Sequence, residues 1–412
     1  MRIIVTGLVG QYAFGGVAWD YLQYVEGFRL LGHDVWYLED TETWPYDPIN
    51  NTVSEDCSYN VKYLGDVMNR LGLGGCWIYR NAPDGSYHGV TEPEAKKICA
   101  STDMFVNVSG CGWLRPEYVA IPKKVFIDSD PMFTQVALVS GNQGVIDRIH
   151  AHDFHFTFAE NIGASNCRVP MAGLKWIPTR QPIVLDWWEP VVGRFPAPKA
   201  FGVNEAAPGE PADSQSRPTT IGQTRDVFTT VMNWVSYKGC EYGGETWGQK
   251  DVEFLKFIDL PQKTNQRFEI AMGMGPGMKR PTELLQQKGW RIIEPSEHLP
   301  DPWTYRDYLG NSKGEWSVAK ESYIKSRSGW FSCRSACYLA LGRPCVLQDT
   351  DWSKIYPTGN GLFAFSTAEE AIAGIDHINA DHARHSAAAR ALAEQMFDAR
   401  KVLGAMLERV GV

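Results

Sequence analysis

The sequence predicts an α/β protein built from two doubly wound domains. At 412 residues the chain exceeds one typical domain of ~150 residues, and its 44% apolar content supports large cores. Buried strands alternate with amphipathic helices in both halves, which predicts parallel sheets. Between the halves, residues 189–226 are rich in Pro, Ala, Gly and Ser and lack periodicity, as in a connection between domains.

The first half begins with a buried strand at residues 2–10 that runs into a glycine turn. A helix is expected at 17–31, where apolar residues recur every three positions, and a second strand at 34–38. This strand–helix–strand unit implies parallel pairing. The remaining strands of this half are predicted at 104–108, 124–128, 154–159 and 174–177, and helices at 59–71 and 93–99.

The second half repeats this alternation. Strands are predicted at 227–234, 267–272, 290–294, 329–331, 344–348 and 361–365, and helices at 249–258, 281–288, 305–310, 317–325, 332–342 and, in segments, 367–409. We therefore expect a first domain at 1–190, a linker at 191–226, a second domain at 227–390, and a helical tail at 391–412 that packs back on the first domain.

Composition excludes several function classes. The formal net charge of −8 disfavours a dedicated nucleic-acid surface. No run reaches the ~18–20 apolar residues of a membrane span, and the first residues enter a strand without the pattern of a signal peptide. The nine cysteines are scattered and contain no CxxC pair. We therefore expect a cytoplasmic protein without a membrane span.

Common cofactor and catalytic signatures are missing from the sequence. The glycines after the first strand do not form GxGxxG, and there is neither a GxSxG nor a Walker A sequence. His150, His152 and His155 invite a metal site, but strand alternation separates the last two, and no Cys or Glu completes a ligand set. No metal or cofactor is expected.

The segment 328–350, SGWFSCRSACYLALGRPCVLQDT, has the strongest binding signal. Ser332 and Ser335 are residue types that start helices, and a helix start offers free N–H groups and partial positive charge to an anion. Arg334 adds a planar cation that matches phosphate oxygens. The alternative interpretation of residues 328–350 is an ordinary helix–strand connection with a surface arginine.

This segment, the sequence GEWSVAK at 314–320, the glycine turn of the first strand and the helical tail resemble GT-B glycosyltransferases. More closely, they resemble bacterial and phage glycosyltransferases of the family-1, spore-protein-like type. The resemblance implies two Rossmann-like domains facing across a cleft, with a nucleotide-sugar on the second and an acceptor on the first. It also implies that Cys337 stands where many such enzymes place a ribose-binding Glu.

Site residues follow from this resemblance. The donor-binding candidates are Lys238, Gly239, Glu315, Ser317, Lys320, Ser332, Cys333, Arg334, Ser335, Gln348, Asp349 and Thr350. Lys250 and Glu253 are weaker candidates, because a solvated helix face explains them equally well. Gly15 and Gly16 are the acceptor-binding candidates.

A base that deprotonates an acceptor hydroxyl would be Asp20 or Asp130. The alternatives are a helix-dipole carboxylate for Asp20 and a turn residue for Asp130. The sequence DSD at 128–130 also resembles the metal motif of GT-A glycosyltransferases, but the two-domain layout argues against that fold. A retaining reaction would need no such base.

The expected function is metal-independent transfer of a sugar from a nucleotide-sugar, with UDP-sugar as the expected donor, to a hydroxyl group. The acceptor is open between a small molecule, a glycan and a modified nucleobase. Two alternatives remain at this stage: a nucleotide-sugar epimerase on the same fold, and a catalytically silent nucleotide-sugar-binding protein. The second is suggested by Cys337, which replaces the ribose-binding Glu of many GT-B enzymes.

Overall fold

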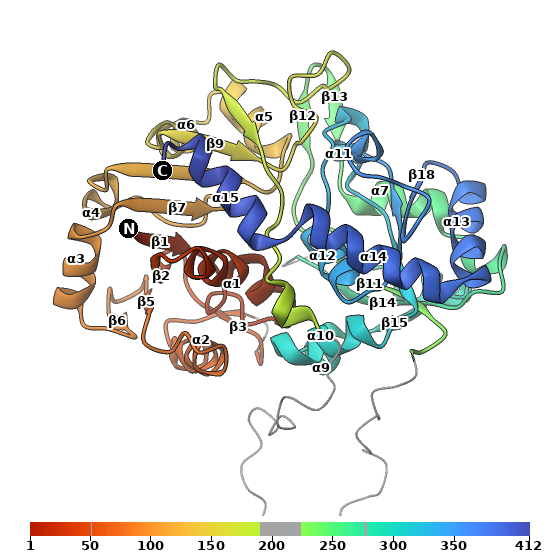
Figure 1. Cartoon of the computed structure of the whole chain (residues 1–412), viewed down its shortest axis with the longest axis horizontal. Helices are drawn as coiled ribbons and strands as arrows, with labels where there is room; N and C mark the ends of the chain where they lie inside the picture. The colour runs from red at the N-terminus through yellow and green to blue at the C-terminus, as the bar shows by residue number, and fades with distance from the viewer. Residues whose placement is uncertain (51, 190–223, 276–277) are drawn as a thin grey trace, which may run out of the picture.

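The computed structural model describes residues 1–50, 52–189, 224–275 and 278–412. It contains two large sheets, each with helices on both faces, side by side in Figure 1. The predicted α/β fold class with two Rossmann-like halves is confirmed. Most of the predicted linker at 191–226 lies outside the described residues.

The first sheet has eight strands in the order β10-β9-β8-β7-β1-β2-β5-β6, and only the β5–β6 pair is antiparallel. Its strands are β1 (Arg2–Thr6), β2 (Asp34–Glu39), β5 (Trp77–Arg80), β6 (Tyr87–His88), β7 (Met104–Val108), β8 (Lys123–Asp128), β9 (Phe154–Thr157) and β10 (Trp176–Pro178), with a separate hairpin of β3 (Tyr46–Asp47) and β4 (Thr52–Val53). The helices are α1 (Gly15–Leu30), α2 (Ser58–Arg70), α3 (Glu92–Ala100), α4 (Pro116–Val119), α5 (Phe133–Val139), α6 (Gln143–His150) and the 3-10 turn η1 (Leu185–Trp188).

The second sheet has six parallel strands in the order β15-β14-β11-β16-β17-β18. Its strands are β11 (Phe228–Asn233), β14 (Phe268–Gly273), β15 (Arg291–Ile293), β16 (Gly314–Ser317), β17 (Cys345–Gln348) and β18 (Leu362–Phe365), with a hairpin of β12 (Cys240–Tyr242) and β13 (Glu245–Trp247). The helices are α7 (Lys250–Phe254), α8 (Thr282–Gln287), α9 (Pro295–His298), α10 (Pro302–Gly310), α11 (Glu321–Ser326), α12 (Cys333–Ala340), α13 (Ala368–Ala380), α14 (His382–Met396), α15 (Ala399–Arg409) and the 3-10 turns η2 (Leu255–Phe257), η3 (Leu260–Gln262) and η4 (Trp352–Lys354).

Both sheets reverse their strand order beside their first strand, between β1 and β7 and between β11 and β16. Chain connections leave in opposite directions at such a point, which opens a crevice at the carboxyl ends of the strands. The central strands are buried on both faces; all five residues of β7 are buried. This explains why they appear in the sequence as continuous apolar runs.

Two predicted elements are wrong. Residues 314–317 form the central strand β16, whereas the sequence suggested a helix from 317 onward; the helix α11 begins only at Glu321. The sequence GEWS does not show the apolar run of a buried strand, because it contains Glu315. This carboxylate is tolerated in the core because it pairs with Arg334. Residues 329–331 form no strand, because the chain turns at Gly329 with a positive φ of 72°.

The last two helices connect the second half back to the first. In Figure 1 α14 lies over the second half and α15 continues onto the first, next to α1. Gly27 of α1 makes this approach feasible, since a Cβ there would lie 2.5 Å from the Leu403 side chain. The described helices include none that is long and apolar enough to cross a membrane.

The start of α1 also packs against the second half. A Cβ on Gly15 would lie 2.3 Å from the Asp301 carbonyl oxygen, and one on Gly16 2.9 Å from the Tyr305 ring. Nearby, the Trp19 indole donates to the Pro302 carbonyl at 2.9 Å. The glycine turn recognised in the sequence therefore lets α1 meet α10 closely.

We expect Gly15→Ala to destabilise the protein by about 1–3 kcal/mol, because the added methyl group meets rigid backbone. Thermal unfolding measures this. Gly404→Ala in α15 is the matched control: among the described residues nothing lies within 4 Å of its added Cβ, and Ala favours helix by ~1 kcal/mol. Equal melting temperatures for the two variants would contradict the close approach.

Candidate functional site

The amino end of α12 faces the carboxyl ends of β16 and β17. Ser332 is its N-cap residue in extended conformation, and Ser335 is fully buried in the first turn. The Ser335 hydroxyl has no hydrogen-bond partner among the residues described. It borders a small cavity of ≈ 20 Å³, room for about one water molecule, lined by Ser317, Val318, Ala319, Trp330, Phe331, Ser332, Arg334, Ser335, Leu347, Gln348, Thr350 and Trp352.

Arg334 lies inward rather than on the surface. Its Nε donates to the Glu315 carboxylate at 2.6 Å, its Nη2 to Ser317 Oγ at 2.7 Å and its Nη1 to the Val231 carbonyl at 2.6 Å. Glu315 is fully buried on β16. Three of five guanidinium N–H groups are thus used, and two remain for a ligand.

A second cluster joins the two halves. The Lys320 ammonium contacts both oxygens of Asp130 at 2.9 and 2.8 Å and the Tyr237 hydroxyl at 2.7 Å. Tyr237 and Tyr323 also donate to Asp130. A carboxylate held by one cation and two phenols is better suited to counter-charge than to proton abstraction, so the catalytic role predicted for Asp130 lacks support here.

Lys250, the first residue of α7, contributes a third cation. Burial and the positive charges of Arg334 and Lys320 hold its pKa well below the usual value. Within the described chain it forms no ion pair. The adjoining Gln249 is 3% exposed, and its Nε2 has no partner in the same set of residues. Unpaired polar groups and crowded cations together indicate an anionic ligand.

Asp20 reaches this region from α1. Burial raises the pKa of its carboxyl group to about 7, against opposing effects from the charge of Arg334 and a hydrogen bond with Cys333. The carboxyl group therefore lies near the start of α12, across the interface between the halves. A pKa near neutrality is the property that a general base requires.

The other predicted donor residues lie in two places. Gln348 is held by Glu253 at 2.7 Å and by the Ala319 amide at 3.1 Å, and Thr350 donates to the Trp330 carbonyl at 2.8 Å. Asp349 caps the η4 turn through Ser353. These residues border or adjoin the small cavity, and their roles stay predictions.

Lys238 and Gly239 are apart from the others. Both are exposed at the entrance to the β12–β13 hairpin. Lys250, which the sequence analysis gave as a weaker donor candidate with a solvated helix face as the alternative, lies among the charges of Arg334, Lys320 and Asp130. The signal available in the sequence was Gln249 and Lys250, an amide and a cation at a helix start shortly after a strand.

Two glycines and a cysteine have packing roles. Gly15 is buried against α10, so acceptor contact at this residue is not supported. Cys337 is 2% exposed, and its sulfur accepts from Gln23 of α1 at 4.0 Å. The residue that departs from the GT-B pattern thus contributes to the contact between α12 and α1.

The three histidines do not converge. Through its ring nitrogens His152 contacts the Arg148 carbonyl at 2.9 Å, and His155 contacts the Ile149 carbonyl at 2.8 Å. Among the described residues no group of three His, Cys, Asp or Glu side chains could hold a metal ion.

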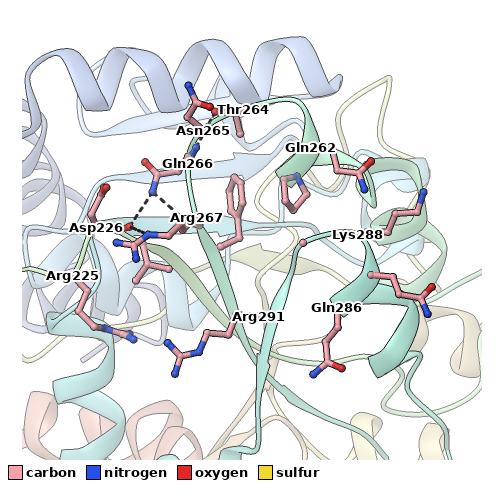
Figure 2. Close-up of a pocket in the computed structure, with 15 residues that line it drawn as sticks. Arg225, Asp226, Gln262, Thr264, Asn265, Gln266, Arg267, Gln286, Lys288 and Arg291 are labelled. Atoms are coloured by element: carbon pink, nitrogen blue, oxygen red, sulfur yellow. Dashed lines mark hydrogen bonds between the residues drawn. The ribbon is translucent and has the colours of Figure 1, made fainter.

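A larger cavity of ≈ 690 Å³ lies at the opposite, amino edge of the second sheet (Figure 2). Its charges are largely matched: Arg225 and Arg291 pair with Glu269 at 2.9 and 3.0 Å, and Lys288 pairs with Asp259 at 2.7 Å. Parallel sheets bind ligands at the carboxyl edge. Volume alone therefore does not make this cavity the site.

No protein-family model matches the sequence, and no curated protein matches it significantly. Solved structures do share its fold. Sucrose-phosphate synthase from Thermosynechococcus elongatus is 12% identical with a TM-score of 0.52, covering 100% of this chain and 99% of its own. HepE of Anabaena, in complex with UDP-glucose, is 9% identical with a TM-score of 0.52 and the same coverage. An alpha-glucosyltransferase in complex with UDP and DNA containing an HMU base is 12% identical with a TM-score of 0.50, covering 99% and 98%. The chain therefore has the GT-B fold.

Arg334 is not the surface arginine of an ordinary helix–strand connection, because its side chain is paired with the buried Glu315. We expect Arg334→Ala to cost about 3–5 kcal/mol, because Glu315 would be left charged and unpaired in the core. Chemical denaturation measures it. Arg384→Ala, which breaks an exposed pair with Asp381, should cost about 0–1 kcal/mol. Equally small losses of stability in Arg334→Ala and Arg384→Ala would show that the Glu315–Arg334 ion pair does not hold the fold together.

Proposed function

We propose that this protein transfers a sugar from a nucleotide-sugar, with UDP-sugar as the donor, to an acceptor hydroxyl. The observation that carries the proposal is the mutual proximity of Arg334, Lys320 and Lys250, with Arg334 in the first turn of α12 beside the unpartnered Ser335 hydroxyl. Three cations, free N–H groups and an orphan hydroxyl match the oxygens of a diphosphate.

The proposal assigns the donor to residues 227–390 and the acceptor to residues 1–190. HepE, which shares the fold and is in complex with UDP-glucose, supports a UDP-sugar as the donor. The nine cysteines are free thiols, in keeping with the reducing cytosol that we propose as its location.

In this reaction the bond between the anomeric carbon and the donor phosphate oxygen breaks. Its electron pair stays on the departing nucleoside diphosphate, where Lys250, Lys320 and α12 offset the developing charge. Because side chains carry this positive charge, a metal ion is not required. The acceptor oxygen forms the new glycosidic bond, and its proton moves to the Asp20 carboxylate.

Donor entry requires movement between the halves. The cavity beside α12 holds about one water molecule, and Lys320 is occupied by Asp130. Cross-domain contacts also close this edge, including the Trp330 indole on the Ser129 carbonyl at 3.1 Å. We therefore propose that the diphosphate displaces Asp130 from Lys320 as the halves separate.

Lys250→Met tests the diphosphate site. We expect UDP affinity to fall roughly 10- to 100-fold, as for loss of a charge-assisted contact. Titration calorimetry with UDP, GDP and ADP on each protein measures it, and EDTA should leave the wild-type affinity unchanged. Lys238→Met is the control, because this lysine is exposed on the hairpin side and should bind UDP normally. Wild-type affinity in Lys250→Met, or no nucleotide binding at all, would end the proposal.

Asp20→Asn tests the base. We expect kcat to fall by about 10²–10⁴ while UDP affinity is retained. Because the base must be ionised, wild-type activity should rise with pH through about 7. A pH–rate profile flat from 5 to 9, or full activity in the variant, would remove Asp20 from the mechanism.

The same substitution should change stability with a defined sign. Burial raises the pKa of Asp20 from its ordinary value of 3.8 to about 7, so ionisation makes folding less favourable as pH rises between these values. Asn does not ionise. The melting temperature of Asp20→Asn relative to wild type should therefore be higher at pH 8 than at pH 4, whereas a pH-independent difference would place Asp20 in solvent.

A further inference from the structure

The carboxyl edge of the first sheet carries an exposed aromatic face. It consists of Tyr12, Trp44, Tyr59 and Trp113, whose exposed fractions are 40%, 46%, 37% and 46%. Single exposed aromatics are common, but four on one edge of a sheet call for a ligand.

Short contacts hold the segments of this face together. Gln11 donates to the Trp44 carbonyl, and the Tyr46 amide donates to the Gln11 carbonyl at 3.2 Å. The Trp113 amide donates to the Asp40 carbonyl at 2.7 Å. Tyr12, Trp44 and Trp113 therefore lie on three loops with fixed backbones, and Tyr59 lies in the first turn of α2.

Asn60, next to Tyr59, closes the arrangement. Its Nδ2 donates to the Gly10 carbonyl at 2.7 Å and to the Tyr46 carbonyl at 2.9 Å. The Tyr46 ring in turn lies 6.1 Å from the ring of Tyr12. The segments that carry the four exposed side chains are thus hydrogen-bonded to one another along this edge of the sheet.

The charge of this face is negative. Residues 41–60 contain four acids, Glu42, Asp47, Glu55 and Asp56, and no Lys or Arg. The neighbouring cations are in ion pairs: Arg80 and Arg115 with Asp40 and Glu42, and Lys62 with Asp66. Burial, followed by the carboxylates of Asp47 and Glu294, raises the pKa of Tyr46. A polyphosphate backbone would be repelled here, because nucleic-acid sites pair aromatic residues with cations.

Aromatic rings and carboxylates, with the neighbouring cations already in ion pairs, are suited to neutral sugars. The C–H face of a pyranose ring packs on an aromatic ring, while carboxylate and amide oxygens accept its hydroxyl protons. Rings on three separate loops match a ligand of several units. We propose that this face binds a neutral oligosaccharide or polysaccharide and presents its hydroxyl group to the proposed sugar transfer.

This inference rests on the proposed function and specifies its acceptor. The loop that carries Tyr12 leads directly into α1, on which Asp20 lies. The Tyr21 hydroxyl, next to Asp20, is hydrogen-bonded with Ser109, close in sequence to Trp113. The loops that carry Tyr12 and Trp113 are therefore both linked to α1, the helix of the proposed base.

The test is direct binding without a donor. A panel of glucose-, galactose-, mannose- and N-acetylglucosamine-based tetrasaccharides and a 13-mer duplex DNA would be titrated while tryptophan fluorescence is followed. We expect at least one neutral tetrasaccharide to bind, and Trp44→Ala and Trp113→Ala to weaken it by roughly tenfold each while UDP affinity is unchanged.

Tyr12→Ala is matched by Tyr242→Ala, an equally exposed tyrosine on the hairpin of the other half, which should bind the sugar normally. Binding of no tetrasaccharide, binding of DNA with a steep salt dependence, or equal loss in both tyrosine variants would overturn the inference. These results differ from failure of the proposed function, in which UDP itself does not bind.

Discussion

The buried ion pair between Glu315 and Arg334 is the contact on which the site depends. Glu315 lies on the central strand β16 and Arg334 in the first turn of α12, so the pair fixes the start of the helix to the middle of the sheet. A buried pair gives little net stability, but its geometry is stringent because either partner alone is costly. The direction in which α12 presents its amino end is therefore set by the core.

This arrangement explains what the sequence could and could not predict. The helix start at Ser332 and the strand after Gly342 follow local rules, so both were predicted. The strand at 314–317 was missed, because its charged Glu interrupts the apolar pattern of a buried strand and the arginine that neutralises it comes 19 residues later. Only the tertiary fold reveals that partner, and the same holds for Lys250, whose environment combines α7, α11 and α12.

The contacts between the halves were also beyond sequence analysis. Asp130 and Lys320 are 190 residues apart and were proposed separately as a base and a donor ligand, yet they pair directly. Two oppositely charged groups at facing sheet edges neutralise each other when no ligand separates them. The Lys320–Asp130 pair holds the facing edges of the two sheets together and keeps Lys320 in position. In the proposed reaction, the donor diphosphate would replace the Asp130 carboxylate on this lysine.

The proximity of Asp20 to Arg334 connects the donor and acceptor halves of the proposed reaction. Burial raises the pKa of Asp20, and the positive charge of Arg334 holds it below what burial alone would give. A diphosphate at α12 would offset that charge, so the pKa of Asp20 would rise further. A carboxylate that is still ionised then becomes a stronger base once the donor is present. In the proposed reaction, the electrostatics of Asp20 and Arg334, one residue from each half, thus make the strength of the base depend on the donor.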